Sequence, residues 1–370
     1  MTLIEQLKTT PDPRGKRGKR HPLWLLLFVS LLGSLCGYWG YRPLAKFCKK
    51  HRKTFLKLLT LDSVQVILPS YSTFRRIFQL VNAQDWVDAF NVWAIGHAPE
   101  FAGKLWSIDG KSIRCTSVGG NTSDQDFAML VSVYGQKAGV VQMELMYNAK
   151  INEVAVAQRL IKRVTGNANL AKSLPGGFSL DALHSRTETL SLLASRHRHY
   201  IVGLKRNQKN LYQQAERLTF TTVPLSEATH VEQKHGRQTR RTVRVYAAPE
   251  LPKRWDSSSI TRIISVTREG TRKGKPFSHE HFYLSNWDLD ASNFLEEIRQ
   301  HWQIENGLHW VKDVTLKEDY PPLRGGYAPI NWAVFNSFLI TLIRRLGCRT
   351  IPDGIRELTN QVEDVFRLLT

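Results

Sequence analysis

The sequence predicts an α/β protein in which a mixed sheet with flanking helices follows an all-helical N-terminal segment. Helical apolar periodicity runs from residue 22 to about residue 98. Three short apolar runs separated by turn residues follow within residues 105–147, and residues 154–204 alternate between helical and strand patterns. Consecutive strands followed by alternating helix and strand indicate a sheet of mixed direction.

The composition is globular and strongly basic. A chain of 370 residues with 42% hydrophobic and 23% charged residues can bury a large core, and its length favours two or more domains. The formal net charge of +20 indicates a polyanionic partner, of which nucleic acid is the simplest. Charge alone implies neither sequence specificity nor catalysis.

Two features predict a cytoplasmic protein without membrane contact. The four cysteines form no CxxC pair, which excludes a zinc ribbon or a dithiol redox motif and fits a reducing compartment. The apolar run 23–35 follows the basic residues 14–21, but it is short for a membrane span and shows no cleavage site. We therefore expect a buried helix there.

The N-terminal part is predicted to be a helical domain covering residues 1–98. Residues 1–20 are typical of a flexible basic lead, and residues 72–76 of a helix start with arginines in its first turn. Pro99 and Gly103 mark the domain boundary. Three aromatic residues recur at helical spacing and are expected in the core: Trp86, Phe90 and Trp93.

The remaining residues, 99–370, are predicted to form a second domain. Its five predicted strands span residues 105–109, 127–134, 140–147, 178–181 and 200–204. Helices are expected at residues 154–164, 186–194, 298–319 and 330–346. Residues from about 209 to 286 interrupt the alternation, which indicates an inserted β-rich subdomain with strands at residues 241–247, 262–267 and 281–284.

Two aspartates end predicted strands of this domain. Asp109 follows Trp106 and Ile108, and Asp181 follows Leu180. Acids at strand ends match the place where α/β sheets put their active sites. Taken singly, each has a simpler interpretation that we favour: a turn at Asp109 and its following glycine, and a helix N-cap at Asp181.

A third acid, Glu305, lies in a helical apolar pattern. Ile298, Trp302 and Leu308 recur around it, which predicts that Glu305 sits on a semi-buried face. Burying a lone carboxylate costs several kcal/mol unless a cation compensates. A metal ion shared with other carboxylates is the usual compensation where a site also processes phosphates.

Set side by side, several segments resemble a known family. In chain order they are DPRGKRGKRHPL, PSYSTFRRIF, SIDGKSIR, LDALHSRTETL, YIVGLKRNQ, HGRQTRR, HWQIENGLHWVKDV and EDYPPLRGGYAPINWAVF. Over nearly its whole length the chain resembles the DDE transposases of bacterial insertion sequences, nearest to the H-repeat-associated group. The resemblance implies a ribonuclease H-like fold with a mixed five-stranded sheet and a β-rich insertion between the second and third acids.

The resemblance also implies an activity. Asp109, Asp181 and Glu305 fit the acidic triad, and as catalytic and metal-binding residues they would hold Mg²⁺, with Mn²⁺ as a substitute. The implied function is a transposase that binds the terminal inverted repeats of its insertion sequence, cleaves the DNA and transfers the strands to a target. The implied partner is double-stranded DNA, bound by a homodimer at the bacterial nucleoid.

Basic residues supply candidates for contacts with DNA phosphates. Those of the N-terminal domain are Arg14, Lys16, Arg17, Lys19, Arg20, Arg75 and Arg76, and those of the second domain are Lys111, Arg114, Lys205, Lys312 and Arg324. A solvated basic face is an equal alternative for most of the second set. Lys312 stands at the lysine of the Tyr-Arg-Glu-Lys signature of related insertion-sequence enzymes, although this chain has Ile298 and His301 in place of the tyrosine and the arginine.

Histidines near the acids leave other interpretations open. His184 and His309 could orient acids or DNA, but a structural role is the favoured prediction. His301, Glu305 and His309 recur every four residues and could hold zinc, yet the HExxH spacing of zinc hydrolases is absent. Two other classes of function also remain: a domesticated DNA-binding protein that retains the fold, and a stand-alone metal-dependent nuclease.

Overall fold

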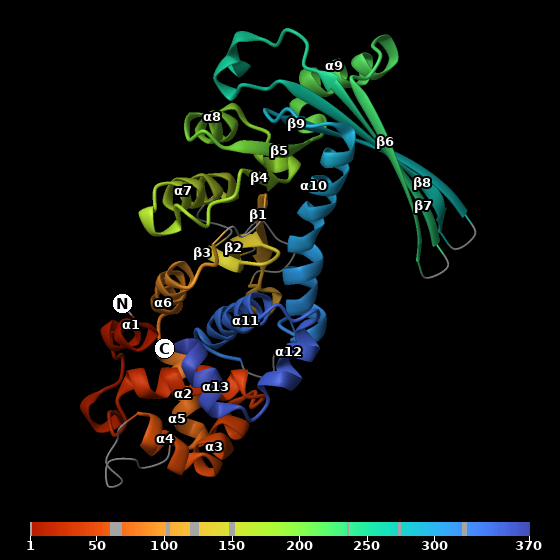
Figure 1. Ribbon diagram of the computed structural model, residues 1–370. Coiled ribbons are helices and arrows are strands. Elements are labelled where there is room, and N and C mark those ends of the chain that lie inside the picture. The colour runs from red at the N-terminus through yellow and green to blue at the C-terminus, as the bar shows by residue number, and fades with distance from the viewer. Residues whose placement is uncertain are drawn as a thin grey trace. The chain divides into compact units, whose positions relative to one another are not determined.

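Two compact units make up the chain in a computed structural model that describes residues 2–59, 69–100, 104–118, 126–147, 152–234, 237–272, 275–319 and 324–370 (Figure 1). Unit one comprises Met1–Ala102, Gly110–Asn152 and Asn306–Thr370, and unit two comprises Gly103–Asp109 and Glu153–Glu305. The N-terminal helices, which the sequence places in a domain of residues 1–98, share unit one with the C-terminal helices.

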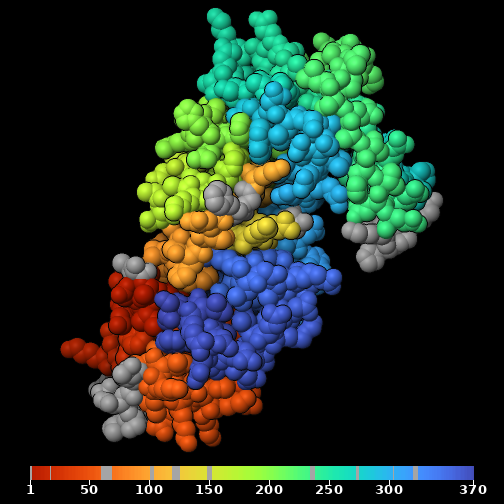
Figure 2. All heavy atoms as spheres, in the orientation of Figure 1, coloured from red at the N-terminus to blue at the C-terminus, as the bar shows by residue number. Residues whose placement is uncertain are grey.

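The helices of unit one pack around a long buried helix, α11. They are α1 (Leu3–Thr9), α2 (Leu23–Leu35), α3 (Tyr41–Lys50), α4 (Arg52–Leu58), α5 (Tyr71–Leu80), α6 (Ala83–Gly96), α11 (Ala328–Arg345), α12 (Ile351–Leu358) and α13 (Val362–Leu369). Phe78 of α5 stacks on Trp332 of α11 with ring centroids 4.5 Å apart, and the rings of Trp86 and Phe335 lie 4.6 Å apart. Figure 2 shows the red and orange N-terminal segment against the blue C-terminal segment. The three aromatics predicted in the core are all buried.

The first residues form a helix where a flexible lead was expected. Thr2 and Glu5 make a capping box at the start of α1, and Leu3 and Leu7 are buried. The apolar run Leu23–Leu35 forms α2, most of whose residues are buried, so the predicted internal helix is confirmed. Among the described residues, no helix is both long and apolar enough to cross a membrane.

Nine strands form one mixed sheet in the order β3-β2-β1-β4-β5-β9-β8-β7-β6. They are β1 (Leu105–Ser112), β2 (Ala128–Gly135), β3 (Gly139–Tyr147), β4 (Gly177–Leu180), β5 (His199–Leu204), β6 (Ser226–Lys234), β7 (Arg237–Ala247), β8 (Arg262–Arg272) and β9 (Lys275–Ser285). β1, β4 and β5 run parallel, whereas β2 is antiparallel to β3. The five predicted core strands are all present, within a residue or two of their expected starts.

The predicted count of five strands is corrected, whereas the three strands expected in the β-rich insertion are present as β7, β8 and β9. Strand β9 pairs with β5 in antiparallel fashion, so the four strands β6 to β9 extend the same sheet. The segment also begins with a helix, α9 (Lys209–Thr221), that the sequence pattern did not reveal. β6 was missed because SEATHVEQK carries almost no apolar residues, as befits a strand at the edge of the sheet.

Three longer helices complete unit two: α7 (Glu153–Thr165), α8 (Thr187–Ser195) and α10 (Ala291–Ile304). α10 lies along the strands of this unit in Figure 1, and its Phe294 and Ile298 join a buried cluster with Val243 and Ile264. After Ile304 the helix continues as two wider π-helical turns, Glu305–His309 and Val311–Thr315. The predicted helix 298–319 therefore ends at residue 315 and changes its winding at Glu305.

Candidate active site

Asp109 and Asp181 follow directly after the last paired residues of two parallel strands. Ser107 pairs with Ser179 and Ile108 with Leu180; Asp109 is the next residue within β1, and Asp181 is the first residue after β4. Because side chains alternate between the faces of a strand, Asp109 shares a face with Ser107 and Asp181 follows Ser179 in the same way. The hydroxyls of Ser107 and Ser179 are 2.8 Å apart, which identifies this common face. β1 runs on to Ser112, so the turn favoured for Asp109 is wrong.

Asp181 fulfils the predicted capping role. Its carboxylate accepts a hydrogen bond of 2.7 Å from the backbone N–H of Leu183, at the start of the short 3₁₀ turn Ala182–His184. The residues after β5 brace this turn: the Asn207 amide donates to the carbonyl of Ala182 at 2.7 Å, and the Gln208 amide to that of Ser185 at 2.8 Å. Asn207 and Gln208 both belong to the segment YIVGLKRNQ quoted above, but no local sequence pattern reveals which carbonyl groups they bind.

Glu305 is exposed, which corrects the semi-buried position expected for it. Ile298 and Leu308 are buried as predicted, but Trp302 is 53% exposed. The energetic argument from a buried lone carboxylate therefore does not apply. The case for a metal depends instead on which groups Glu305 meets.

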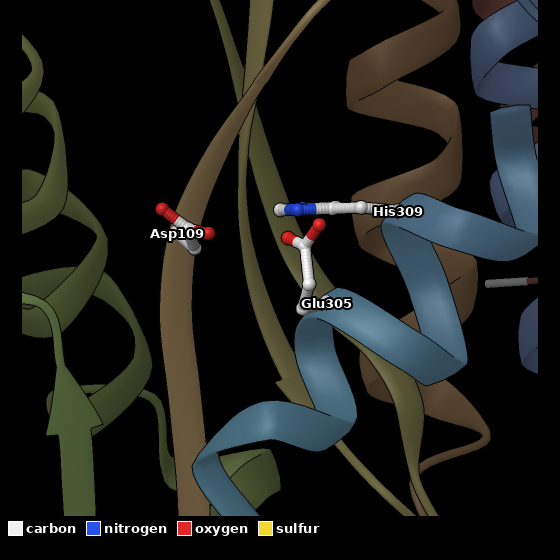
Figure 3. A group of neighbouring side chains, drawn as sticks. All are labelled: Asp109, Glu305 and His309. Atoms are coloured by element: carbon white, nitrogen blue, oxygen red, sulfur yellow. The ribbon is translucent and has the colours of Figure 1, made fainter. Parts of the chain in front are cut away.

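Two carboxylates and an imidazole converge at the junction of strand and helix. One ligand atom each from Asp109, Glu305 and His309 lie within 4.8 Å of one another. Figure 3 shows Glu305 and His309 projecting from successive turns of the helix toward the strand that carries Asp109. Asp181 is not a member of this group. His309, expected to be structural, belongs to it, and its position four residues after Glu305 is the signal that could have identified it.

The His301 side chain contacts the strands and does not join Glu305 and His309 in the possible zinc site considered from their spacing. Its Nδ1 lies 2.9 Å from the hydroxyl of Ser179. Burial lowers the pKa of His301 to about 4, against the opposing effect of the nearby Asp181 and Glu305 carboxylates. The ring is therefore neutral at physiological pH and lies close to two of the three predicted acids.

Lys111 and Lys312 are unsuited to the DNA contacts predicted for them. The Lys111 ammonium lies 2.6 Å from Asp313 and 3.6 Å from Asp319, and its side chain is only 8% exposed. Lys312 is 2% exposed, lies 3.7 Å from Glu318 and donates to a backbone carbonyl; burial lowers its pKa. Both ammonium groups are neutralised by carboxylates, so we remove both residues from the set of DNA contacts.

The other basic candidates of this part of the chain, Arg114, Lys205 and Arg324, are exposed. Arg114 contacts Asp319 at 3.4 Å, yet 73% of its side chain remains accessible. His184 is fully buried, with Nε2 3.7 Å from a carboxylate oxygen of Glu153, which agrees with its favoured structural role.

A basic groove lies on the N-terminal helices. Its volume is about 710 Å³, and Lys16, Arg20 and Arg76 line it together with Ser70 and Thr73. Arg75 and Lys19 are exposed as well, whereas the Arg17 side chain lies outside the described residues.

Arg14 is the exception among the predicted N-terminal contacts. It is 9% exposed, and its guanidinium binds Asp12 at 2.8 Å and the carbonyl of His21 at 2.7 Å. It supports the loop that forms the groove and is not counted as a phosphate contact.

Comparison with known proteins places these sites in context. Residues 102–321 match the family described as "Transposase DDE domain", and residues 4–94 match the one described as "DDE_Tnp_1-associated". The chain is 24% identical to "Putative transposase YncI" of Escherichia coli O157:H7, over 98% of this chain and 91% of that protein. It is 22% identical to "H repeat-associated putative transposase YhhI" of Escherichia coli strain K12, over 88% of this chain and 86% of that protein.

Proposed function

Because the chain belongs to the DDE transposase family, in its H-repeat group, we propose that it cuts the ends of an insertion sequence and joins them to target DNA with Asp109, Asp181 and Glu305 as its metal-binding carboxylates. The observation that carries this proposal is the approach of Asp109 to Glu305. These residues are far apart in the chain, yet their carboxylates lie within 4.8 Å of each other.

The topology supports a ribonuclease H-like core. The order β3-β2-β1-β4-β5 joins an antiparallel hairpin to a parallel set, and the two aspartates follow in register on neighbouring parallel strands. The helix that carries the third acid comes after strands β6 to β9, as expected for an insertion between the second and third acids.

The donor set fits a hard divalent cation. Carboxylate oxygens are the ligands that Mg²⁺ and Mn²⁺ prefer, and the imidazole of His309 favours a transition metal over Mg²⁺. Divalent ions bound there would supply the chemistry of an activated water and of a neutralised leaving oxygen. Asp109 and Glu305 would hold the ions between strand and helix, with Asp181 reaching them from β4. Their exposure leaves room for a phosphodiester to enter.

Neither proposed step needs a redox partner. Cleavage adds water across a P–O bond and leaves a 3′-hydroxyl, and joining lets that oxygen displace another oxygen at a target phosphodiester. The three acids serve both steps, because both pass through the same pentavalent phosphorus geometry. Two DNA ends must be processed together, so we propose that the active form is a dimer on DNA.

The groove lined by Lys16, Arg20 and Arg76 supports recognition of terminal repeats by the N-terminal helices. Cations along a groove suit backbone phosphates, and the exposed face of α5 offers side chains for base contacts. Because residues 1–98 share a core with the C-terminal helices, their removal would disrupt unit one, and point substitutions are the appropriate probe.

The decisive experiment incubates the full-length protein with a plasmid that carries the gene and its flanking DNA, plus an unmarked target plasmid. We expect Mg²⁺-dependent nicks at the element boundaries and joined products. Nicks without joining would indicate a nuclease, and binding without nicks would indicate a domesticated DNA-binding protein. The variants Asp109→Asn, Asp181→Asn and Glu305→Gln separate chemistry from binding.

A further inference from the structure

A hydrogen-bonded chain of three polar side chains lies beneath the proposed acids. The hydroxyls of Ser107 and Ser179 are 2.8 Å apart, and the hydroxyl of Ser179 is 2.9 Å from Nδ1 of His301. Ser107 is 4% exposed and Ser179 is 1% exposed. We call these three residues the serine–histidine layer. It joins β1, which carries Asp109, with β4 and α10, which Asp181 and Glu305 directly follow, and all of it lies within unit two.

Each residue of the layer precedes one of the acids by two residues in a strand or by one turn of helix. Ser107 precedes Asp109 by two residues in β1, and Ser179 precedes Asp181 by two residues, so each pair shares a face of the sheet. His301 precedes Glu305 by four residues, about one turn of the helix. Each acid therefore follows a residue of the layer along the chain, at the next position on the same side of its strand or helix.

The serines of the layer are buried, so their polar atoms carry a cost unless they are paired. Ser107 and Ser179 are 4% and 1% exposed, and the buried residues that alternate with them, Trp106 and Ile108 in β1 and Phe178 and Leu180 in β4, point to the other face of the sheet. Unpaired hydroxyl and imidazole groups are unfavourable in such a place. Pairing of all three polar groups requires β1, β4 and α10 to stay within hydrogen-bond distance of one another.

We propose that Ser107, Ser179 and His301 are positioning residues that set the spacing of Asp109, Asp181 and Glu305 for a divalent cation. The inference rests on the function proposed above, since it assumes that these acids bind the metal. It adds that the hydrogen-bonded chain of Ser107, Ser179 and His301 fixes the separation of the three acids. It also adds that His301 faces the sheet and does not contact DNA.

Titration of the full-length protein with Mn²⁺ alone, followed by electron paramagnetic resonance of the free ion, tests the proposal without DNA. Ser179→Ala breaks both hydrogen bonds of the layer while keeping the volume of the side chain. We expect Mn²⁺ affinity to fall on the order of ten-fold, as for other residues that support metal ligands. Ser285→Ala is the matched control, because Ser285 is a buried strand serine whose hydroxyl donates to the carbonyl of Tyr200 at 2.7 Å, away from the acids.

A second pair of variants distinguishes a specific loss of Mn²⁺ affinity from a general loss of folding. His301→Asn keeps a polar group where Nδ1 stands, and His301→Leu removes it. The proposal predicts near-normal Mn²⁺ affinity for His301→Asn and weakened affinity for His301→Leu, at similar thermal stability. Equal effects of Ser179→Ala and Ser285→Ala, or no effect of Ser179→Ala, would overturn it.

The Asp109→Asn variant distinguishes failure of the inference from failure of the proposed function. If Asp109→Asn abolishes Mn²⁺ binding while Ser179→Ala leaves it unchanged, only the positioning role is lost. If Asp109→Asn binds Mn²⁺ as the unchanged protein does, the metal site is misassigned and the positioning role is overturned with it.

Discussion

The hydroxyls of Ser107 and Ser179 lie 2.8 Å apart on neighbouring parallel strands, two residues before Asp109 and Asp181. This contact fixes which face of the sheet the two aspartates share. It also lies against His301 of α10, so one short hydrogen-bonded chain relates the strand acids to the helix that carries Glu305. The predictions below follow from this arrangement and from the ion pairs around it.

Replacing a single acid should stop DNA cleavage without unfolding the protein. Asp109→Asn, Asp181→Asn and Glu305→Gln each remove a negative ligand and keep the shape of the side chain. We expect cleavage of the plasmid that carries the element to fall at least about a thousand-fold, because each substitution removes part of the charge that offsets the cation. Binding to the terminal repeat, measured by gel shift, should stay within about three-fold, since phosphate contacts elsewhere dominate affinity. If cleavage and DNA binding were lost together, the assignment of these three acids as metal ligands would be contradicted.

Removal of the metal by a chelator should likewise abolish DNA cleavage and leave DNA binding intact in the unchanged protein. With EDTA present, the complex with terminal-repeat DNA should form and no nick should appear; added Mn²⁺ should restore nicking. The restored activity should be absent from Glu305→Gln at any Mn²⁺ concentration. Nicking that resists EDTA would contradict a metal-dependent mechanism.

The buried pair of Lys312 and Glu318 should govern stability. Glu318 is 4% exposed and accepts a hydrogen bond of 2.8 Å from Asn336 in addition to its contact with Lys312. Lys312→Met leaves that carboxylate without its cation and should cost about 3–5 kcal/mol in the free energy of unfolding, measured by urea denaturation. The double variant Lys312→Met/Glu318→Gln should recover most of the loss.

Lys317→Met is the control for this pair, because Lys317 is exposed and adjacent in the chain. Its cost should be within about 0.5 kcal/mol. Glu318 and Asp319 are 4% and 8% exposed, so neutralising either one should lower the stability of the fold. A Lys312→Met protein as stable as the control would show that the pair contributes nothing.

The two exposed arginines of α5, one of which lines the basic groove, should contribute to the salt dependence of DNA binding. Replacing Arg75 and Arg76 together with alanine removes two exposed cations from α5. If both contact phosphates, the slope of log affinity against log salt should decrease in magnitude by about 1.8, or about 0.9 for each contact. Arg356→Ala/Arg367→Ala removes two exposed arginines that pair with acids on their own helices, and its slope should match the unchanged protein. Equal slopes for both double variants would place the phosphate contacts elsewhere.

Local patterns were sufficient for much of the fold. The strands around Trp106, Phe178 and Tyr200 were predicted because their apolar residues are buried, and α2 and α11 because they are apolar on nearly all sides. β6 and α9 were missed, since both are largely polar and contribute few residues to the core. The π-helical turn at Glu305 was also missed, because a residue pattern at helical spacing does not report a change of winding.

The candidate site was predicted less completely, for physical reasons. Asp109, Asp181 and Glu305 were identified through a family resemblance, and the strand register then shows why two of them are neighbours. The pairing of Lys111 with Asp313 could not be predicted, because the partners are about two hundred residues apart and lone charges usually lie on the surface. The same holds for the hydrogen bond between Ser179 and His301.

The most direct test of the central claim is to map where the metal binds. Fe²⁺ replaces Mg²⁺ in the full-length protein, and with ascorbate and peroxide it generates radicals that cut the backbone close to its ligands. We predict cuts near residues 109, 181 and 305, and the loss of all three in Asp109→Asn. Cuts confined to the region of Asp313, Glu318 and Asp319, or a pattern unchanged in Asp109→Asn, would contradict the assignment of the metal to the strand–helix junction.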